Sequence, residues 1–445
     1  MRGVRRLIVT AAVLVAPVAS WVAAEVLTGR ELRRQLRRLE ALGRPMSVEA
    51  LRPAPVEETE NAAIVLRRAF AVMSGGTTNF TALAQAFERL DSLWAGETPV
   101  FDRLHADASL AAETRSGLAR PEVVAALDLL RAAAARPRCD WRLAYERGPN
   151  LALPHLRPLG QGVSLMCLRS WAASRDGNLG EAFDWAGAAF SVAGMAFEDR
   201  TVVSFLTALH AQRRVLDTLP HILGPDAEAI EALGTAVARR RAELRSQLAV
   251  ALDAERILFS DGVFHRLLDP SVAAADPPDS PRLLPRGFER WLGVLRPFVR
   301  ANYARYLRLH HRLQEAIGSP SDHGLVGLER RVGALPGWAV FCTLLLPDVA
   351  GVAERAAEAE LAHDIASLGL ALELHWLRSG AYPDSLDDLG DAGAVSIPLA
   401  RIPPVRYIRE ANGVVLVPEP SLAATGGRLV RGIRGGGAYR WEVRR

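Results

Sequence analysis

Residues 1–39 read MRGVRRLIVTAAVLVAPVASWVAAEVLTGRELRRQLRRL, and this stretch decides the architecture of the chain. Three arginines come first, and an uncharged apolar run follows from Leu7 to Ala24. A helix is the single-segment conformation that satisfies its own backbone polar groups in hydrocarbon, and roughly 18 residues is about the minimum span. Pro17 is tolerated in such a helix, and Trp21 suits its interfacial end. We therefore expect residues 1–28 to form a single-pass anchor whose partner is membrane lipid.

Two alternatives remain for this segment. Val22, Ala23 and Ala24 offer small residues at which a signal peptide could be cleaved before Glu25. An ordinary buried terminal helix is the other alternative, although basic residues followed directly by an apolar run are typical of targeting segments. The sequence favours the uncleaved anchor.

The residues after the anchor, 29–60, bear on its orientation. Five arginines between residues 30 and 38 outnumber the three before the run, and this count places the body in the cytoplasm. Leu32, Leu36 and Leu39 recur among them at helical spacing. The stretch is therefore either a basic amphipathic helix on anionic headgroups or an ordinary solvated helix face. Prolines and carboxylates after Gly43 then predict an extended spacer.

Composition excludes several classes of function. The 445 residues are 49% hydrophobic and 23% charged, which is an ordinary globular mixture. The 54 basic residues nearly balance the 50 acidic residues and are interspersed with them, so no nucleic-acid partner is expected. The chain contains no lysine, which excludes a P-loop, a lysine Schiff base and a Ser/Lys dyad. Cys139, Cys167 and Cys342 form no CxxC pair, and the apolar neighbours of the last two predict burial.

The pattern between residues 61 and 317 predicts a large helical body. Apolar residues recur at helical steps, and Pro121 marks the first turn of one helix. Residues 164–174 and 179–196 form a predicted helical hairpin around the turn Asp176-Gly177-Asn178. Further helices are expected at residues 202–219, 227–254 and 288–316, and a proline-rich break at residues 270–287.

The C-terminal part, residues 318–445, combines one long helix with short strands. Residues 332–347 are apolar but short for a second membrane crossing, so a buried helix is favoured. A long amphipathic helix follows and should stop near Gly380. The Asn412-Gly413 turn predicts a hairpin, and residues 427–443 suggest another pair of strands. The expected fold class is therefore mainly α, with an anchor helix, a large helical body and a small C-terminal α+β part with a short antiparallel sheet.

Residues 353–389, with LALELHWLRSGAYPDSLDDL at their centre, resemble the helix-to-globular junction of type II secretion pseudopilins and of signal-anchored bacterial envelope proteins with a YRxxHGxYPxSLxxL-like motif. The matching residues are Tyr382, Pro383, Ser385, Leu386 and Leu389. The resemblance implies that Tyr382 and Pro383 pack the end of a long helix against a small antiparallel sheet, which is a structural role. No prepilin processing site precedes the anchor, and ARIPP replaces the DPFxG segment of pseudopilins. Neither pilus assembly nor calcium binding is therefore expected.

The elements GRPMSVEAL, ENAAIVLRRAF, RGPNLALPHL, RDGNLGEAFDWA and ALDAERILF are similar, in this order, to elements of the same uncharacterised family of signal-anchored envelope proteins. This wider resemblance implies a body displayed outside the cytoplasm, against the arginine count. It implies no mechanism.

No catalytic or metal-binding motif is evident. The chain lacks HExxH, GxSxG and GxGxxG. His311 and Glu315 share a helix face beside His310, but a metal site needs further ligands, so surface histidines are the favoured interpretation. The adjacent carboxylates Glu57, Glu58 and Glu60 precede a predicted helix, whose N-terminal dipole explains them. No cofactor and no metal are expected.

The loop from Cys139 to His155 is the remaining candidate site. Asp140, Glu146 and His155 are its polar residues suited to a function, because loops carry function more often than helix faces do. The alternative is that aromatic residues pin this loop onto the helical core while the polar residues stay in water.

Two classes of function remain. The favoured class is a non-enzymatic, membrane-anchored envelope protein whose helical body binds a protein partner. The alternative is a membrane-anchored hydrolase with a site near the Cys139–His155 loop. One deep pocket with convergent polar groups would favour the hydrolase, and a broad apolar or charged surface would favour partner binding.

Overall fold

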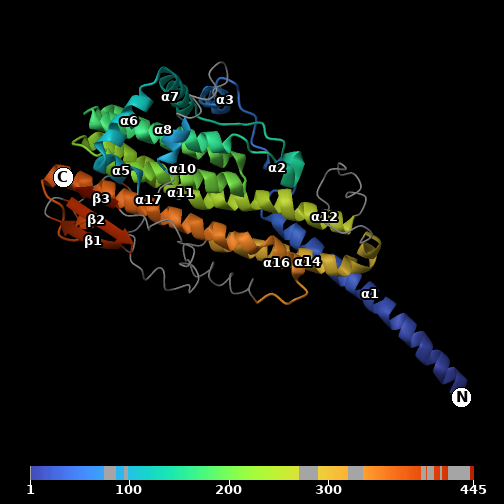
Figure 1. Ribbon diagram of the computed structural model, residues 1–445. Helices are drawn as coiled ribbons and strands as arrows, with labels where there is room; N and C mark the ends of the chain where they lie inside the picture. Colours follow the sequence, from blue (N-terminus) through green and yellow to red (C-terminus); the bar gives the residue numbers. More distant parts are fainter. Residues whose placement is uncertain are drawn as a thin grey trace. The chain divides into compact units, whose positions relative to one another are not determined.

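The computed structural model describes residues 2–74, 87–94, 99–269, 289–318, 334–391, 397, 405–410, 413–418 and 441–444. Side chains are described for all of these except residues 2–14, 289–292, 347–350, 390–391, 418 and 444. The chain is mainly helical, and three strands form an antiparallel sheet near the C-terminus (Figure 1). The predicted fold class is confirmed to this extent.

The chain divides into two compact units. Unit 1 comprises Met1–Arg52, Ala144–Leu151 and Ala249–Ala353, and unit 2 comprises Pro53–Leu143, Ala152–Leu248 and Glu354–Arg445. The long helices α11 (Ala227–Glu255) and α17 (Pro347–Ser379) contribute residues to both units.

Unit 1 begins with α1, a single helix of 40 residues from Arg2 to Ala41. It contains the predicted anchor segment and continues without interruption through the arginine-rich stretch, with Pro17 inside it. The side chains of residues 15–23 are exposed, Val15 and Val18 each by 62%. Among the described residues, no helix combines the length and apolarity needed to cross a membrane. The side chains of residues 7–14, almost half of the apolar run from Leu7 to Ala24, lie outside the described part.

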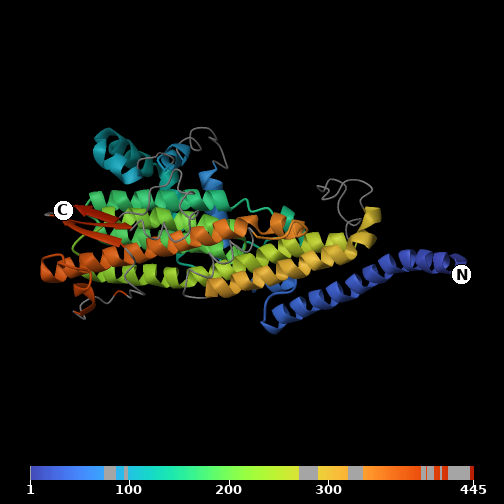
Figure 2. The same ribbon diagram turned by 90° about the horizontal axis from the view of Figure 1, so that it is seen from below.

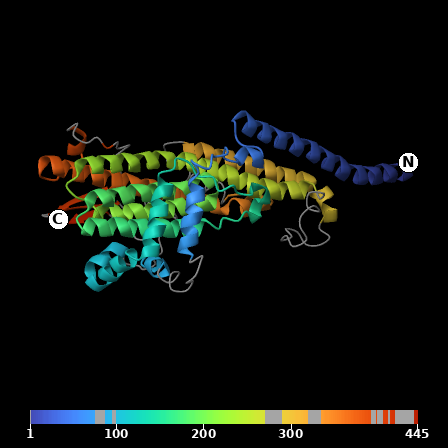
Figure 3. The same ribbon diagram turned by 90° about the horizontal axis from the view of Figure 1, so that it is seen from above.

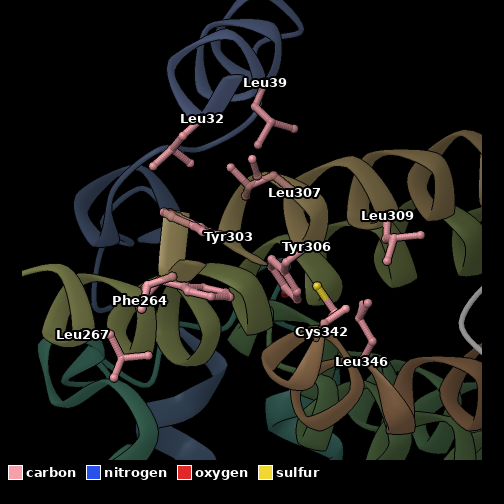
Figure 4. Packing of buried hydrophobic residues seen from close by; sticks show 13 residues of the cluster. Leu32, Leu39, Phe264, Leu267, Tyr303, Tyr306, Leu307, Leu309, Cys342 and Leu346 are labelled. Carbon is pink, nitrogen blue, oxygen red and sulfur yellow. The ribbon is translucent and has the colours of Figure 1, made fainter. Parts of the chain in front are cut away.

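The second half of α1 packs along α14 (Glu289–Gly318) (Figures 1 and 2). Leu32 and Leu39 lie in one buried cluster with residues of α14, of α12 (Gly262–Leu268) and of α16 (Val340–Leu345), and Leu36 packs against it (Figure 4). Each leucine buried in this way stabilises the contact by roughly 1.5 to 3 kcal/mol. Protein therefore covers these leucines, so an amphipathic helix whose leucine face lies in the membrane is ruled out for this stretch.

Polar contacts set the direction of this packing. The indole nitrogen Nε1 of Trp21 donates to the carbonyl of Val294 at 2.9 Å. Glu25 pairs with Arg300 at 2.5 Å, and Arg38 approaches Glu315 at 3.6 Å. Residue numbers rise together on both helices, so α1 and α14 run parallel.

The predicted extended spacer contains a short helix, α2 (Val48–Leu51). The hydroxyl of Ser47 caps it by accepting from the backbone N–H of Ala50 at 3.4 Å, which explains why the chain turns helical between its prolines.

Unit 2 is built from helices whose positions the sequence largely predicts. Besides α11 and α17, the described helices of unit 2 include α3 (Ala62–Met73), α5 (Val100–Ala106), α6 (Ala108–Leu118), α7 (Pro121–Ala134), α8 (Leu156–Arg175), α9 (Leu179–Gly194), α10 (Val202–Thr218) and α18 (Asp388–Asp391). Pro121 occupies the first turn of α7, as predicted. The predicted hairpin is confirmed in α8 and α9, which lie side by side (Figure 3). The small alanine side chains of α9 let the two helices approach closely. At this close distance the hydroxyl of Ser170 in α8 donates to the backbone carbonyl of Ala182 at 2.6 Å.

Two ion pairs join α11 to α17 within unit 2. Nε of Arg241 lies 2.9 Å from the carboxylate of Asp364, and Nε of Arg245 lies 2.6 Å from that of Glu360. Both carboxylates are buried and both receive two guanidinium hydrogen bonds, a bidentate geometry that fixes the register of the helices.

The helix α17 ends at Ser379, and Gly380 follows with a φ of 78°, so the predicted stop is confirmed. The strands β1 (Val405–Glu410) and β2 (Gly413–Pro418) form the predicted hairpin, with Glu410 opposite Gly413. The strand β3 (Trp441–Arg444) pairs with β2. The predicted first strand and turn of 427–443 lie outside the described residues, as does the predicted break at 270–287.

The motif residues form the junction between helix and sheet. Tyr382 is buried, and its hydroxyl donates to the carboxylate of Glu373 in α17 at 2.5 Å. The hydroxyl of Tyr407 in β1 donates to the carbonyl of Pro383 at 2.8 Å. The backbone N–H of Ser385 is capped by Asp388, Leu386 is half-buried and Leu389 is buried. These contacts connect the end of α17 to the sheet.

The apolar segment near residue 340 forms only the short helix α16. Ala339, Cys342 and Leu346 are buried, whereas Trp338 and Leu344 are exposed. The predicted buried helix therefore has one buried face and one exposed apolar face.

The close approach of α17 to the sheet requires glycine at position 369. A Cβ atom there would lie 2.2 Å from the ring of Trp441, which is fully buried. We expect Gly369→Ala to lower the free energy of unfolding by about 1 to 3 kcal/mol through overpacking, although alanine favours the helix. Gly187→Ala in α9, where a Cβ meets nothing within 4 Å, should instead raise it by up to about 1 kcal/mol. Chemical denaturation of both variants measures the difference, and equal gains in stability would contradict the packing described here.

Candidate functional site

The three residues predicted for the loop site have separate roles. The carboxylate of Asp140 accepts from the backbone N–H of Arg142 at 2.8 Å, which stabilises the positive φ of that residue. Glu146 forms an exposed ion pair with Arg52 at 2.7 Å. Glu146 belongs to unit 1, whereas Asp140 and His155 belong to unit 2. The loop itself contains the 3₁₀-helix η1 (Tyr145–Asn150).

His155 is half of a buried pair that the sequence did not predict. Its Nε2 lies 2.7 Å from Oδ2 of Asp199, and the side chains are 6% and 1% exposed. Asp199 ends the 3₁₀-helix η2 (Met195–Asp199). Burial raises the pKa of Asp199, and the hydrogen bond with His155 opposes this rise. The pair is therefore held in an apolar setting, where a hydrogen bond between acid and imidazole is strong.

Local backbone signals place Asp199 opposite His155. Arg200 adopts a left-handed conformation with a φ of 57°, which ends η2. The hydroxyl of Thr201 then caps α10 by accepting from the backbone N–H of Ser204 at 3.1 Å. His155 immediately precedes α8 and stacks on Trp141, with ring centroids 4.1 Å apart. The pair therefore joins the loop to the start of α10.

The chemistry open to this pair is limited by its surroundings. A His–Asp pair can orient an imidazole as a general base, but the base must reach the proton that it removes. His155 is covered by Trp141, which itself stacks on Phe70. Burial and the nearby Asp199 raise the pKa of Cys139, so this thiol stays protonated. The geometry is that of a structural fastening, as in the alternative in which aromatic residues pin the loop. The other part of that alternative, polar residues that stay in water, holds for Glu146 but is wrong for His155.

A second buried polar cluster lies in unit 1. Arg256 is fully buried and lies at the start of a π-helical turn, η4 (Arg256–Asp261). The π-helix joins residues five positions apart, and this step brings Asp261 within 2.5 Å of the Arg256 guanidinium. The guanidinium also donates to the carbonyl of Pro45, just beyond α1. One arginine thus connects the π-helix to the segment that follows α1.

Further charged and polar groups surround Arg256. Arg44 pairs with the buried Asp253 at 3.1 Å. His310 of α14 lies 3.1 Å from the carbonyl of Leu252 and 4.0 Å from Asp253. Asp261 also interacts with the hydroxyl of Tyr303, and burial raises the pKa of that tyrosine. Two arginines face two aspartates here, so the cluster is balanced in charge.

The cluster strongly perturbs its ionisable groups. Burial, with a smaller effect of Arg256, lowers the pKa of His310 to about 3. Burial raises the pKa of Asp253 and of Asp261, and the neighbouring arginines oppose this rise. Nε of Arg256 and Nδ1 of His310 have no hydrogen-bond partner among the described residues. The prediction of surface histidines is wrong for His310 and His311, because α14 turns both inward.

The described part of the chain holds no group of three or more His, Cys, Asp or Glu side chains arranged to bind a metal ion. All three cysteines are buried and free, as predicted for Cys167 and Cys342. Comparisons with protein-family models, with curated proteins and with solved structures found no match to this chain.

The neutral state of His310 predicts how stability depends on pH. The pKa of His310 is lowered in the folded chain, so the folded state favours the neutral imidazole. The contribution of His310 to the free energy of unfolding is therefore fully present above the unfolded pKa of about 6.5 and is lost as pH falls toward 3. Between pH 7.5 and 5.5 the free energy of unfolding of the wild type should fall by about 1.4 kcal/mol more than that of His310→Gln. Denaturant unfolding at both pH values measures this, with His375→Gln as a control because His375 is only half-buried. Parallel losses in the wild type and His310→Gln would show that His310 is not buried in neutral form.

Proposed function

We propose that this protein is a non-enzymatic, membrane-anchored envelope protein whose helical body binds a protein partner. The structure of α1 carries this proposal, because one uninterrupted helix joins the predicted anchor segment to a stretch docked on α14. Within the predicted anchor segment, α1 exposes Val15, Val18 and Val22 to solvent. A membrane would cover these side chains.

The docking of α1 supports an anchor that is retained. The small-residue cleavage point after Ala24 lies inside the helix. Trp21 on one side of it contacts Val294, and Glu25 on the other side pairs with Arg300. Cleavage would remove the Trp21 contact and would require the helix to open. These contacts favour the uncleaved anchor over the cleaved signal peptide.

An exposed apolar surface in unit 1 supports a protein partner. Trp338, Val340 and Leu344 are 45%, 46% and 66% exposed, and they lie in an uncharged segment. The guanidinium of Arg305 sits over the Trp338 ring, 5.2 Å from its centroid. Exposed apolar residues beside an arginine and a tryptophan are typical of the centre of a protein interface. We name Trp338, Val340 and Leu344 the α16 patch.

The alternative function, a membrane-anchored hydrolase near the Cys139–His155 loop, stays a prediction. The His155–Asp199 pair is the observation in its favour. A hydrolase would need His155 to reach a substrate or a water molecule, and Trp141 covers this side chain. We therefore do not propose it.

Photo-crosslinking in native membranes tests the proposed function. A benzoylphenylalanine placed at Leu344 in the full-length chain should yield one discrete crosslinked protein, and the protein should stay in the membrane after a carbonate wash. The matched control is Val203, which is 57% exposed on α10 and should give no discrete adduct. Release by carbonate would overturn the anchor. Membrane retention with no adduct from position 344 would overturn the partner surface.

The location of the body is a further part of the proposal. We place it outside the cytoplasm, in accord with the resemblance to signal-anchored envelope proteins, although arginines are more numerous after the apolar run than before it. A C-terminal alkaline phosphatase fusion should be active. An inactive phosphatase fusion together with a fluorescent C-terminal green fluorescent protein fusion would place the body in the cytoplasm.

A further inference from the structure

The solvent-facing side of α1 changes from apolar to basic within two helical turns. Ala23, Val26 and Leu27 are exposed, and the exposed arginines Arg30, Arg33, Arg34 and Arg37 follow. Each of these residues lies three or four positions from another residue of the set, so all of them share one face of the helix. The opposite face carries the buried Leu32 and Leu39. We name the four arginines the arginine ridge.

The charge of the ridge is largely unpaired. Arg34 approaches Glu31 at 3.7 Å but remains 79% exposed. No ion pair of Arg30, Arg33 or Arg37 is found among the described residues. Glu31 is drawn instead toward α14, where Arg308 lies 3.4 Å from its carboxylate. The ridge therefore presents net positive charge to its surroundings.

The ridge begins close to the end of the predicted anchor. At about 1.5 Å per residue, Arg30 lies roughly 9 Å beyond Ala24 along the helix axis, and Arg34 roughly 15 Å. Headgroups occupy about 5 to 8 Å on each side of the hydrocarbon, and charges act over a further 8 Å or so at physiological ionic strength. Long arginine side chains pointing toward the bilayer therefore bring the first three guanidinium groups within range of lipid phosphates.

We propose that the arginine ridge binds the phosphate groups of anionic phospholipids. This inference rests on the proposed membrane anchor and adds the class of lipid that surrounds it. Arginine suits the role because its planar guanidinium donates two hydrogen bonds to one phosphate. The leucine face is fixed on α14, so α1 holds the ridge in one orientation at the membrane surface. Each arginine near an anionic surface contributes about a fivefold preference for binding anionic lipid over lipid without net charge.

Lipid binding to the full-length protein tests the proposal. Native mass spectrometry from micelles containing equimolar phosphatidylglycerol and phosphatidylcholine gives the ratio of the two lipids bound. The variant Arg30→Gln/Arg33→Gln/Arg34→Gln should lower this ratio at least tenfold, whereas the corresponding Arg→Lys triple should retain most of it. The control triple Arg157→Gln/Arg239→Gln/Arg312→Gln removes the same charge from other exposed positions and should leave the ratio within about twofold.

The outcomes separate this proposal from the anchor itself. An unchanged ratio in the ridge triple, or an equal fall in the control triple, would overturn the ridge proposal. Equal binding of both lipids by a wild type that resists the carbonate wash would also overturn it and leave the anchor standing. A wild type that binds neither lipid and is released by carbonate would overturn both.

Discussion

A guanidinium buried in a protein interior must be met by partners, because removing its charge from water costs several kcal/mol. Arg256 imposes this constraint on unit 1, since it is 0% exposed. The π-helical turn brings Asp261 to it, and the chain beyond α1 brings the carbonyl of Pro45. Arg44 and Asp253 extend the same cluster toward α14 through His310. The segment that follows α1 is therefore held by charge, while Leu32 and Leu39 hold the second half of α1 by burial.

This fastening has consequences for function. A helix attached at one end only by a flexible linker would let the body move freely above the membrane. The polar and apolar contacts of α1 instead run from Trp21 to Arg38, so the predicted anchor continues directly into unit 1. Such a connection suits a protein that presents the α16 patch in one orientation relative to the predicted anchor. It also leaves the outer face of α1 free for lipid headgroups.

The parts of the fold that were predicted from sequence depend on local signals. Pro121 begins α7, the Asp176-Gly177-Asn178 turn separates α8 from α9, and Gly380 follows the last residue of α17, each because of its own backbone preferences. The parts that were missed depend on distant partners. His155 pairs with a residue 44 positions away, and His310 contacts the carbonyl of Leu252, 58 positions away. Periodicity shows that a residue lies on a helix, but it does not show which helix covers it. The arginines near His310 in the sequence suggested that this histidine lies on the surface. The structure buries it instead, against the carbonyl of Leu252.

Hydrogen exchange tests the docking of α1 on α14. The full-length protein in nanodiscs would be followed by mass spectrometry over hours. Peptides covering residues 25–41 should exchange as slowly as those of α14 around Tyr303 and Leu307, because both helices share one buried cluster. Complete exchange of residues 25–41 within seconds, with α14 still protected, would show that α1 is a free helix that is not docked on α14.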